Sequence, residues 1–243
     1  MAKNNRSSSR IVKPPEAPKD LSKEDTLYGL SLDPYQKLLR DAIYDRRKEI
    51  VFCNACAGSG KTTVSICTAV LMHEYELYDN LVYIVHSVGD AQGYLPGDIT
   101  QKSSVLFEPL YQALIVAGQN PESVITKESL YNQKYGISYV TAITDTYLRG
   151  SNIGSNDDTI LIIDEAQNFD EFSLRKTLTR ACPGTKVIVI GHDGQIDLAN
   201  KSRSGFIKCR DHFLSKHDDR VASCDLKINH RGFVSQVADE SWD

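Results

Sequence analysis

The chain has 243 residues, and we expect that length to form one α/β domain with its own core rather than two large lobes. Its formal charge of -4 at pH 7 excludes a uniformly basic nucleic-acid binder but allows a local basic patch. No apolar run approaches the roughly 18 residues of a membrane-spanning helix, and the polar N-terminus lacks the apolar part of a secretory signal. We therefore expect a cytoplasmic protein without membrane contact, whose six cysteines are reduced thiols rather than a disulfide framework.

Residues 1–25 predict a flexible, mildly basic tail, followed by a single domain over residues 26–243. The first twenty residues hold five Lys or Arg, two acids and three prolines. Such a segment buries too little apolar surface to offset the entropy that is lost on ordering. We interpret it as a solubilising arm, with occasional nucleic-acid contact as the alternative.

The rest of the chain alternates predicted strands with predicted helices. The first helix follows Asp33, a suitable N-cap, and has Pro34 at its first position. Apolar runs typical of buried strands occupy residues 50–54, 81–85, 137–142, 159–164, 186–191 and 221–228, and helical patterns fall at about 60–75, 101–117, 171–181 and on either side of the last run. Strands that are apolar on both faces and alternate with helices predict a mainly parallel central sheet flanked by helices, a three-layer α/β fold.

A glycine-rich loop stands between the first apolar run and the next helix. Residues 55–62 read ACAGSGKT, which matches the phosphate-binding pattern G-x-x-x-x-G-K-[ST] except for Ala55 at the first glycine. Gly58 and Gly60 allow backbone N–H groups to surround a phosphate at a helix N-terminus, where the helix dipole also favours an anion. The alternative is a Gly-Ser turn that precedes Lys-Thr by chance. We predict that ATP contacts Ala57, Gly58, Ser59, Gly60, Lys61, Thr62 and Thr63.

Two acids follow the apolar run at 159–163. Asp164 and the Thr62 hydroxyl are predicted to hold Mg²⁺, because oxygen ligands beside a phosphate loop suit that ion. Lys61 would reach the β and γ phosphates, and Glu165 would act as the general base on the attacking water. Ordinary helix capping by the two acids is the alternative.

Two further side chains are candidates for contact with the γ phosphate. Gln195, in GHDGQIDL, follows the run at 186–191 and could contact both the phosphate and the attacking water, although alone it is only a loop glutamine. Arg231 follows the last predicted strand and could present its guanidinium to the γ phosphate. The alternative for Arg231 is a solvated arginine at a helix start.

Cys53 and Cys56 have C-x-x-C spacing, which is also found in metal and redox sites. No second pair follows at the spacing of a zinc site, and both residues fall in the predicted strand and phosphate loop. We interpret them as small buried thiols.

Over residues 30–240 the chain resembles the PhoH-like ATPases, whose fold is the RecA-like core of superfamily 1 helicases. The resemblance is carried by the motifs ACAGSGKT, GYLPGDITQKSSVLFEPLYQAL, TYLRG, DEAQN with LTR, and GHDGQIDL. LDPYQ is similar to the helicase Q motif, which implies that Gln36 reads adenine. LKINHRG looks like the Asn-Tyr-Arg motif of those helicases, which implies that Arg231 contacts the γ phosphate. The chain departs from the family at His192, where Asp is usual, and at His86-Ser87, where Arg-Pro is common.

The resemblance also implies an assembly. The chain is similar in length to the compact, often phage-encoded members of this family. If it is encoded by a phage, the cytoplasm in which we expect it is that of the host cell. One lobe supplies half of a helicase cleft, so a homo-oligomer is implied, with a ring as one form. Arg175, Arg180 or Arg231 could then act as an arginine finger, in cis or in trans.

Residues 201–232 contain a candidate surface for nucleic acid, with eight Lys or Arg and four acids. Clustered cations beside Phe206 and Phe213 suit tracking of a single strand and base stacking. The alternative is an amphipathic helix with both rings in the core and a solvated basic face. Tyr94 is another candidate for stacking. The clustered cations are Lys201, Arg203, Lys208 and Arg210.

The sequence thus predicts a P-loop ATPase that binds and hydrolyses ATP with Mg²⁺, coupled to single-stranded nucleic acid, with RNA favoured over DNA. The alternative from another class is a nucleotide-gated oligomer or partner-binding module with negligible hydrolysis. A small-molecule kinase is a third interpretation, but the expected lid arginines after the acidic strand are lacking.

Overall fold

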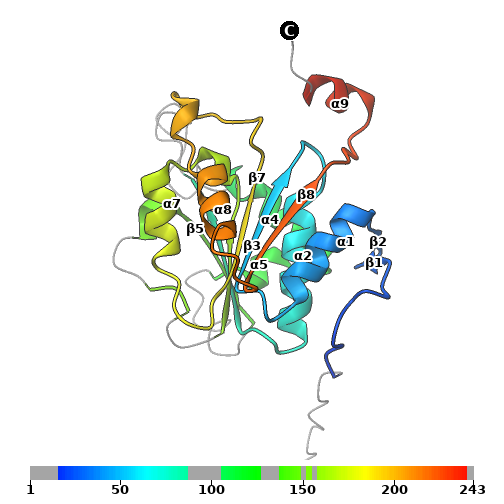
Figure 1. Ribbon diagram of the computed structural model, residues 1–243. Helices are drawn as coiled ribbons and strands as arrows, with labels where there is room; N and C mark the ends of the chain where they lie inside the picture. The colour runs from blue at the N-terminus through cyan, green and yellow to red at the C-terminus, as the bar shows by residue number, and fades with distance from the viewer. Residues whose placement is uncertain (1–15, 87–104, 127–136, 149–151, 155–157, 240–243) are drawn as a thin grey trace, which may run out of the picture.

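The computed structural model describes residues 16–86, 105–126, 137–148, 152–154 and 158–239. Its centre is a six-stranded sheet in the order β5-β4-β6-β7-β3-β8, in which each neighbouring pair is parallel (Figure 1). The strands are β3 (Ile50–Ala55), β4 (Asn80–Val85), β5 (Val140–Thr144), β6 (Thr159–Ile163), β7 (Lys186–Gly191) and β8 (Val221–Leu226).

Helices cover both faces of this sheet, because most strands are apolar on both sides. In β3, Val51 and Cys53 join one buried cluster, while Ile50 and Phe52 join the other. The first cluster lies under α1 (Pro34–Tyr44), α2 (Lys61–Glu74) and α4 (Glu108–Val116), and the second under α7 (Glu171–Leu178) and α8 (Phe206–Leu214). The predicted three-layer α/β fold with a parallel sheet is confirmed.

Short elements complete the described chain. They are β1 (Thr26–Leu27), β2 (Leu30–Ser31), α5 (Pro121–Val124), η1 (Asp145–Leu148), η2 (Ala166–Asn168), η3 (Lys201–Arg203) and α9 (Phe233–Asp239). Of the helix predicted at 101–117, residues 101–104 lie outside the described chain. The strand expected at 137–142 begins later, at Val140. The backbone N–H of Tyr139 donates to the carbonyl of Val124 in α5, and the Tyr139 carbonyl accepts from Leu81 of β4.

Packing begins within the segment predicted as a tail. Leu21 is buried, and the buried guanidinium of Arg40 donates to its carbonyl oxygen at 2.7 Å. The β1–β2 hairpin, which the sequence did not predict, continues this packing against α2. Residues 1–15 lie outside the described chain.

The parallel sheet brings all strand carboxyl ends to one edge. The glycine loop follows β3 and the two acids follow β6, with β7 between these strands. Ligand sites of open α/β sheets lie at such an edge. Within the described ranges, no helix is both long and apolar enough to cross a membrane.

Candidate active site

The phosphate loop depends on two glycines. Gly58 and Gly60 have φ of 66° and 78°, a region that other residues rarely adopt. A Cβ at Gly58 would lie 2.6 Å from Oδ1 of Asn229 and 2.7 Å from Cγ of Arg231. Gly58 is therefore fixed both by its backbone conformation and by the segment after β8, which packs directly on the loop.

Gln36 supports the same loop from α1. It forms a capping box with Asp33, whose carboxylate accepts from the backbone N–H of Gln36 at 2.9 Å. The Gln36 side-chain amide donates to the carbonyl oxygen of Ser59 at 2.9 Å, and its nitrogen would lie 3.0 Å from a Cβ at Gly60. The structure thus places Gln36 against the loop, and its contact with adenine stays a prediction.

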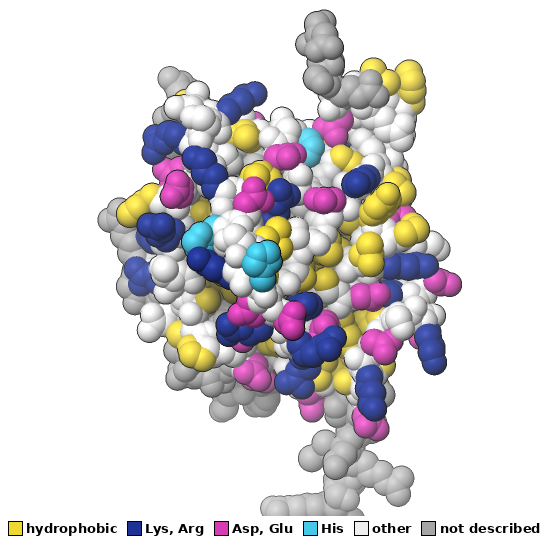
Figure 2. Space-filling model, in the orientation of Figure 1, with side chains coloured by type: hydrophobic (Ala, Val, Ile, Leu, Met, Phe, Trp, Pro, Cys, Tyr) yellow, Lys and Arg dark blue, Asp and Glu magenta, His cyan; other side chains and the backbone are white. Residues whose placement is uncertain are grey.

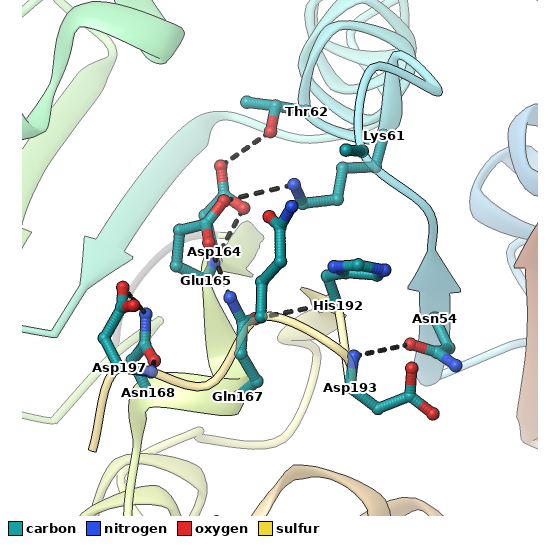
Figure 3. A network of polar contacts seen from close by, with 12 residues as sticks. Asn54, Lys61, Thr62, Asp164, Glu165, Gln167, Asn168, His192, Asp193 and Asp197 are labelled. Atoms are coloured by element: carbon teal, nitrogen blue, oxygen red, sulfur yellow. Dashed lines mark hydrogen bonds and ion pairs between the residues drawn. The ribbon is translucent and has the colours of Figure 1, made fainter. Parts of the chain in front are cut away.

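Asp164 and Thr62 meet at the centre of the site. The Thr62 hydroxyl donates to Oδ2 of Asp164 at 2.7 Å (Figure 3). The Tyr83 hydroxyl donates to the same oxygen at 2.7 Å. Asp164 is 1% exposed, and burial raises the pKa of its carboxyl although Lys61 opposes the shift. A hydroxyl and a carboxylate are hard oxygen donors of the kind that Mg²⁺ takes. Over the residues described, no group of three or more His, Cys, Asp or Glu forms a metal site of its own.

Lys61 and Glu165 form an ion pair beside that centre. The Lys61 Nζ lies 3.1 Å from Oε1 of Glu165, and the Gln167 amide donates to Oε2 at 2.6 Å. Burial alone would raise the pKa of Glu165, but Lys61 and the Gln167 bond outweigh it and hold that pKa below its usual range. Burial alone would lower the pKa of Lys61, but the charges of Asp164 and Glu165 outweigh it and raise that pKa above the ordinary value. The pair is therefore ionised at neutral pH.

Backbone geometry aims Glu165 into the site. Its φ is 51°, a left-handed conformation that is unusual for a residue with a side chain. Strain of this kind often occurs at functional sites, where the surrounding structure maintains it. Here the backbone N–H of Glu165 donates to Oδ1 of Asp164 at 2.7 Å and helps to hold the turn.

A polar network joins the turn after β6 to the loop after β7 (Figure 3). Oε1 of Gln167 accepts from the backbone N–H of His192 at 2.9 Å. Asn168 and Asp197 exchange two hydrogen bonds, at 2.8 and 3.3 Å. The imidazole Nδ1 of His192 is buried and has no hydrogen-bond partner in the described chain. The two loops that carry Glu165 and Gln195 are thus bonded to each other.

Gln195 is connected to the phosphate loop by Asp239, a residue that was not predicted from the sequence. Its exposed amide donates to Oδ1 of Asp239 at 3.0 Å, and Oδ2 of the same carboxylate accepts from the backbone N–H of Ala57 at 3.0 Å. The structure therefore places Gln195 at the loop, with a carboxylate from α9 between them.

Arg231 lies over the loop with an exposed side chain. Its backbone N–H donates to Oδ1 of Asn229 at 2.8 Å, which holds its stem against Gly58. The backbone N–H of His230 donates to the Gly58 carbonyl at 3.0 Å. In the described ranges, the Arg231 guanidinium has no ion pair.

The remaining loop residues and cysteines are less prominent. Ser59 is buried, and its hydroxyl has no hydrogen-bond partner among the residues described. Thr63 is half-buried in the first turn of α2. Cys53 and Cys56 are free thiols, as are the other four, and burial raises the pKa of both.

The structure decides between the alternatives for the aromatic residues near α8. Phe206 is fully buried, and Phe213 packs on Phe52 with ring centroids 5.6 Å apart. Phe206 is therefore a core residue, and stacking of a base on it is wrong. Phe213 is half-buried, and its contact with a base stays a prediction. Tyr94, the GYLPGD motif at 93–98 and Ser87 lie outside the described residues.

Three residues of the site were not named from the sequence. Gln167 could have been found from the sequence, because it lies in the DEAQN motif. Tyr83 had none, since its contact with Asp164 depends on the register that pairs β4 with β6. Asp239 lies 182 residues from Ala57, and no pattern connects the two.

Comparisons with known proteins find relatives of the chain. A family described as PhoH-like protein matches residues 31–236. The PhoH-like protein of Mycobacterium leprae is 32% identical over 210 residues, which cover 84% of this chain and 56% of that protein. The PhoH-like protein of Bacillus subtilis is 29% identical over 185 residues, which cover 74% of this chain and 53% of the relative. The chain thus spans about half the length of these curated relatives.

Among solved structures, the chain is similar to the large terminase from a thermophilic bacteriophage. The TM-score is 0.50 at 14% identity, over 86% of this chain and 49% of the terminase. At this identity the likeness shows the fold alone, which is a RecA-like P-loop fold.

Proposed function

The chain belongs to the PhoH-like protein family, and from that premise we propose that it binds and hydrolyses ATP with Mg²⁺, coupled to single-stranded nucleic acid, with RNA favoured. The observation that carries the proposal is the pairing of Thr62 with Asp164 at 2.7 Å beside the ion pair of Lys61 and Glu165 at 3.1 Å. These side chains would thus supply a phosphate ligand, a metal ligand and a base together at the strand edge.

Phosphate binding would use the loop and the start of α2. Backbone N–H groups at the N-terminus of this helix attract an anion, and the 14-residue length of α2 gives it a full dipole. Lys61 now has Glu165 as its anionic partner. The β and γ phosphates would replace Glu165 as the partner of Lys61, because Lys61 is the first residue of α2 and the phosphates would bind at the N-terminus of this helix.

The donor set fits Mg²⁺ arriving with the nucleotide. Thr62 and Asp164 would hold the ion, which commonly takes one or two protein oxygens and completes its shell with phosphate and water. When bound, Mg²⁺ supplies charge neutralisation at the β and γ phosphates. Tyr83 keeps the Asp164 carboxylate oriented by donating to the same oxygen as Thr62.

Glu165 would act on the attacking water. Once Lys61 turns to phosphate, the Glu165 carboxylate retains the Gln167 amide on Oε2 and has Oε1 free for the proton of water. Its left-handed backbone holds the carboxylate toward the loop. This role requires no rearrangement of β6.

Gln195 and Arg231 would respond to the γ phosphate. Both lie at the loop, Gln195 through Asp239 and Arg231 through its stem against Gly58. An arginine at the γ phosphate is worth on the order of 10³–10⁵ in rate. We assign that role to Arg231 in cis, and an arginine from a neighbouring subunit of a homo-oligomer is the alternative.

The test is phosphate release from Mg·ATP by the wild type and by Lys61→Ala, with and without single-stranded RNA and DNA. Release that Lys61→Ala abolishes is expected. Nucleotide binding with no release above that variant would instead support the nucleotide-gated module.

A further inference from the structure

A groove runs between α7 and α8 on the face of the sheet opposite α1 and α2. Two adjoining hollows of about 510 and 440 Å³ form it, and they share the side chains of Glu171, Arg175 and Lys208. We call it the α7–α8 groove. Figure 2 shows Lys and Arg side chains gathered over the part of this face where α7 and η3 lie.

The charge that the groove offers to a ligand is positive. Arg175, Arg203 and Lys208 line it and are exposed. Two acids also line it, so its cations outnumber its acids by three to two. Glu171 is exposed, while the carboxylate of Asp170 accepts from Arg203 at 2.8 Å and from the backbone N–H of Ser173 at 2.8 Å. Arg175 has no ion pair within the described residues. The net negative charge of the chain allows a local basic patch, and the groove is such a patch.

An aromatic ring stands beside these cations. Phe172, in the first turn of α7, lines the larger hollow and is 75% exposed. An exposed ring of this size in a basic groove is suited to stacking, since every base presents a π face. The sequence had suggested Phe206 and Phe213 for this role, but Phe206 is fully buried and Phe213 is half-buried.

Both walls of the groove continue into the ATP site. Asp170, at the start of α7, follows Glu165 through the short helix η2. The backbone N–H of Gly205 donates to the carbonyl of Phe169 at 2.9 Å, and a Cβ at Gly205 would lie 2.8 Å from the Cα of Glu171. The walls are thus in direct contact where the groove meets the turn that carries Glu165.

We propose that the α7–α8 groove is the binding site for single-stranded nucleic acid, with phosphates at Arg175 and Lys208 and a base stacked on Phe172. The inference rests on the proposed function and locates the partner of that function. The binding site touches the segments that continue from Glu165 and Gln195, so an occupant is positioned to alter hydrolysis. The combination of exposed cations with an exposed ring favours nucleic acid over an acidic peptide, for which a ring is not needed.

The test is fluorescence anisotropy with labelled 20-nucleotide oligouridylate and oligothymidylate over a series of salt concentrations. Arg175→Ala/Lys208→Ala is expected to weaken binding at least about tenfold and to reduce the slope against log salt by about 0.7 for each phosphate that the variant no longer neutralises. Phe172→Ala is expected to weaken binding about fivefold or more with an unchanged slope. The matched controls are Lys19→Ala/Lys23→Ala and Phe233→Ala, exposed residues that do not line the groove and should bind as the wild type does.

Circular dichroism and thermal unfolding of each variant would establish that it is folded. If the groove variants and their controls have the same affinity for the polymers, the assignment of the groove is overturned. No binding of either polymer by the wild type would overturn it as well, in favour of a protein partner. Phosphate release from the same wild-type preparation separates this result from failure of the ATPase proposal. Release without polymer binding contradicts the groove and the coupling to nucleic acid, but leaves ATP hydrolysis in place.

Discussion

The carboxylate of Asp239 accepts a hydrogen bond from the backbone N–H of Ala57 at 3.0 Å, so an acidic side chain from α9 lies against the phosphate loop. Its second oxygen accepts from Gln195 at 3.0 Å. The N–H groups of such a loop are donors for phosphate, and a carboxylate close to a bound phosphate would repel it.

Asp239→Asn is therefore expected to tighten ATP binding. Two unit charges about 4 Å apart in water interact with about 1 kcal/mol, which corresponds to a factor of about five in affinity. Titration of a fluorescent ATP analogue would measure it, with Asp79→Asn as control, since Asp79 is exposed and precedes β4 at the opposite edge of the sheet. Equal affinity in the wild type and Asp239→Asn would show that the carboxylate does not oppose the nucleotide.

Gly58→Ala is expected to remove ATP binding. The new Cβ would collide with Asn229 and Arg231 at 2.6 and 2.7 Å, and the backbone conformation is left-handed. Gly118→Ala is a matched control, because Gly118 has a φ of 72° but no atom within 4 Å of an added Cβ. That control should lose about 1 kcal/mol of stability from backbone strain and keep its ATP affinity. Retained affinity in Gly58→Ala would contradict the account of the loop.

Glu165→Gln tests the general base. The amide keeps the shape of the carboxylate but cannot take a proton, so hydrolysis should fall by about 10²–10⁴ while ATP still binds. Single-turnover phosphate release would separate the two effects. Glu49→Gln, at the opposite end of β3, should hydrolyse at the wild-type rate. Full activity in Glu165→Gln would assign the base elsewhere.

Lys186 gives a prediction for stability against pH. Burial lowers its pKa to about 8, while its Nζ donates to the carbonyl of Asp45 at 2.9 Å. Between about pH 8 and the ordinary value of about 10.4, the unfolded chain binds more protons at this site than the folded chain does, so stability should rise with pH. Urea unfolding at pH 7.5 and 9.5 should show the wild type gaining up to about 2 kcal/mol relative to Lys186→Met. A constant difference between the two proteins would contradict the lowered pKa.

Much of the fold could be predicted because burial on both faces of a strand is visible in the sequence. The runs at β3, β6 and β7 have that pattern, and alternation with helices leaves a parallel sheet as the natural arrangement. The meeting of Thr62 and Asp164 also follows from pattern, since Asp164 directly follows β6 and Thr62 follows the glycine loop at the carboxyl end of β3.

Contacts across the chain could not be predicted in this way. The seven-residue spacing of Phe206 and Phe213 places them on one side of a helix, but only the packing of α8 on Phe52 shows that this side is the core. The exposure of Phe172 could not be predicted for the same reason, because the sequence does not show which face of α7 packs on the sheet. The bond between Asp239 and Ala57 depends on how α9 returns to the loop.

Steady-state phosphate release from Mg·ATP, by the wild type and Lys61→Ala, tests the central proposal most directly. The account predicts release that is stimulated by single-stranded RNA more than by DNA and is lost in Lys61→Ala, because that variant removes the cation at the β and γ phosphates. Release by the wild type no greater than by Lys61→Ala, with and without either polymer, would contradict hydrolysis at this site.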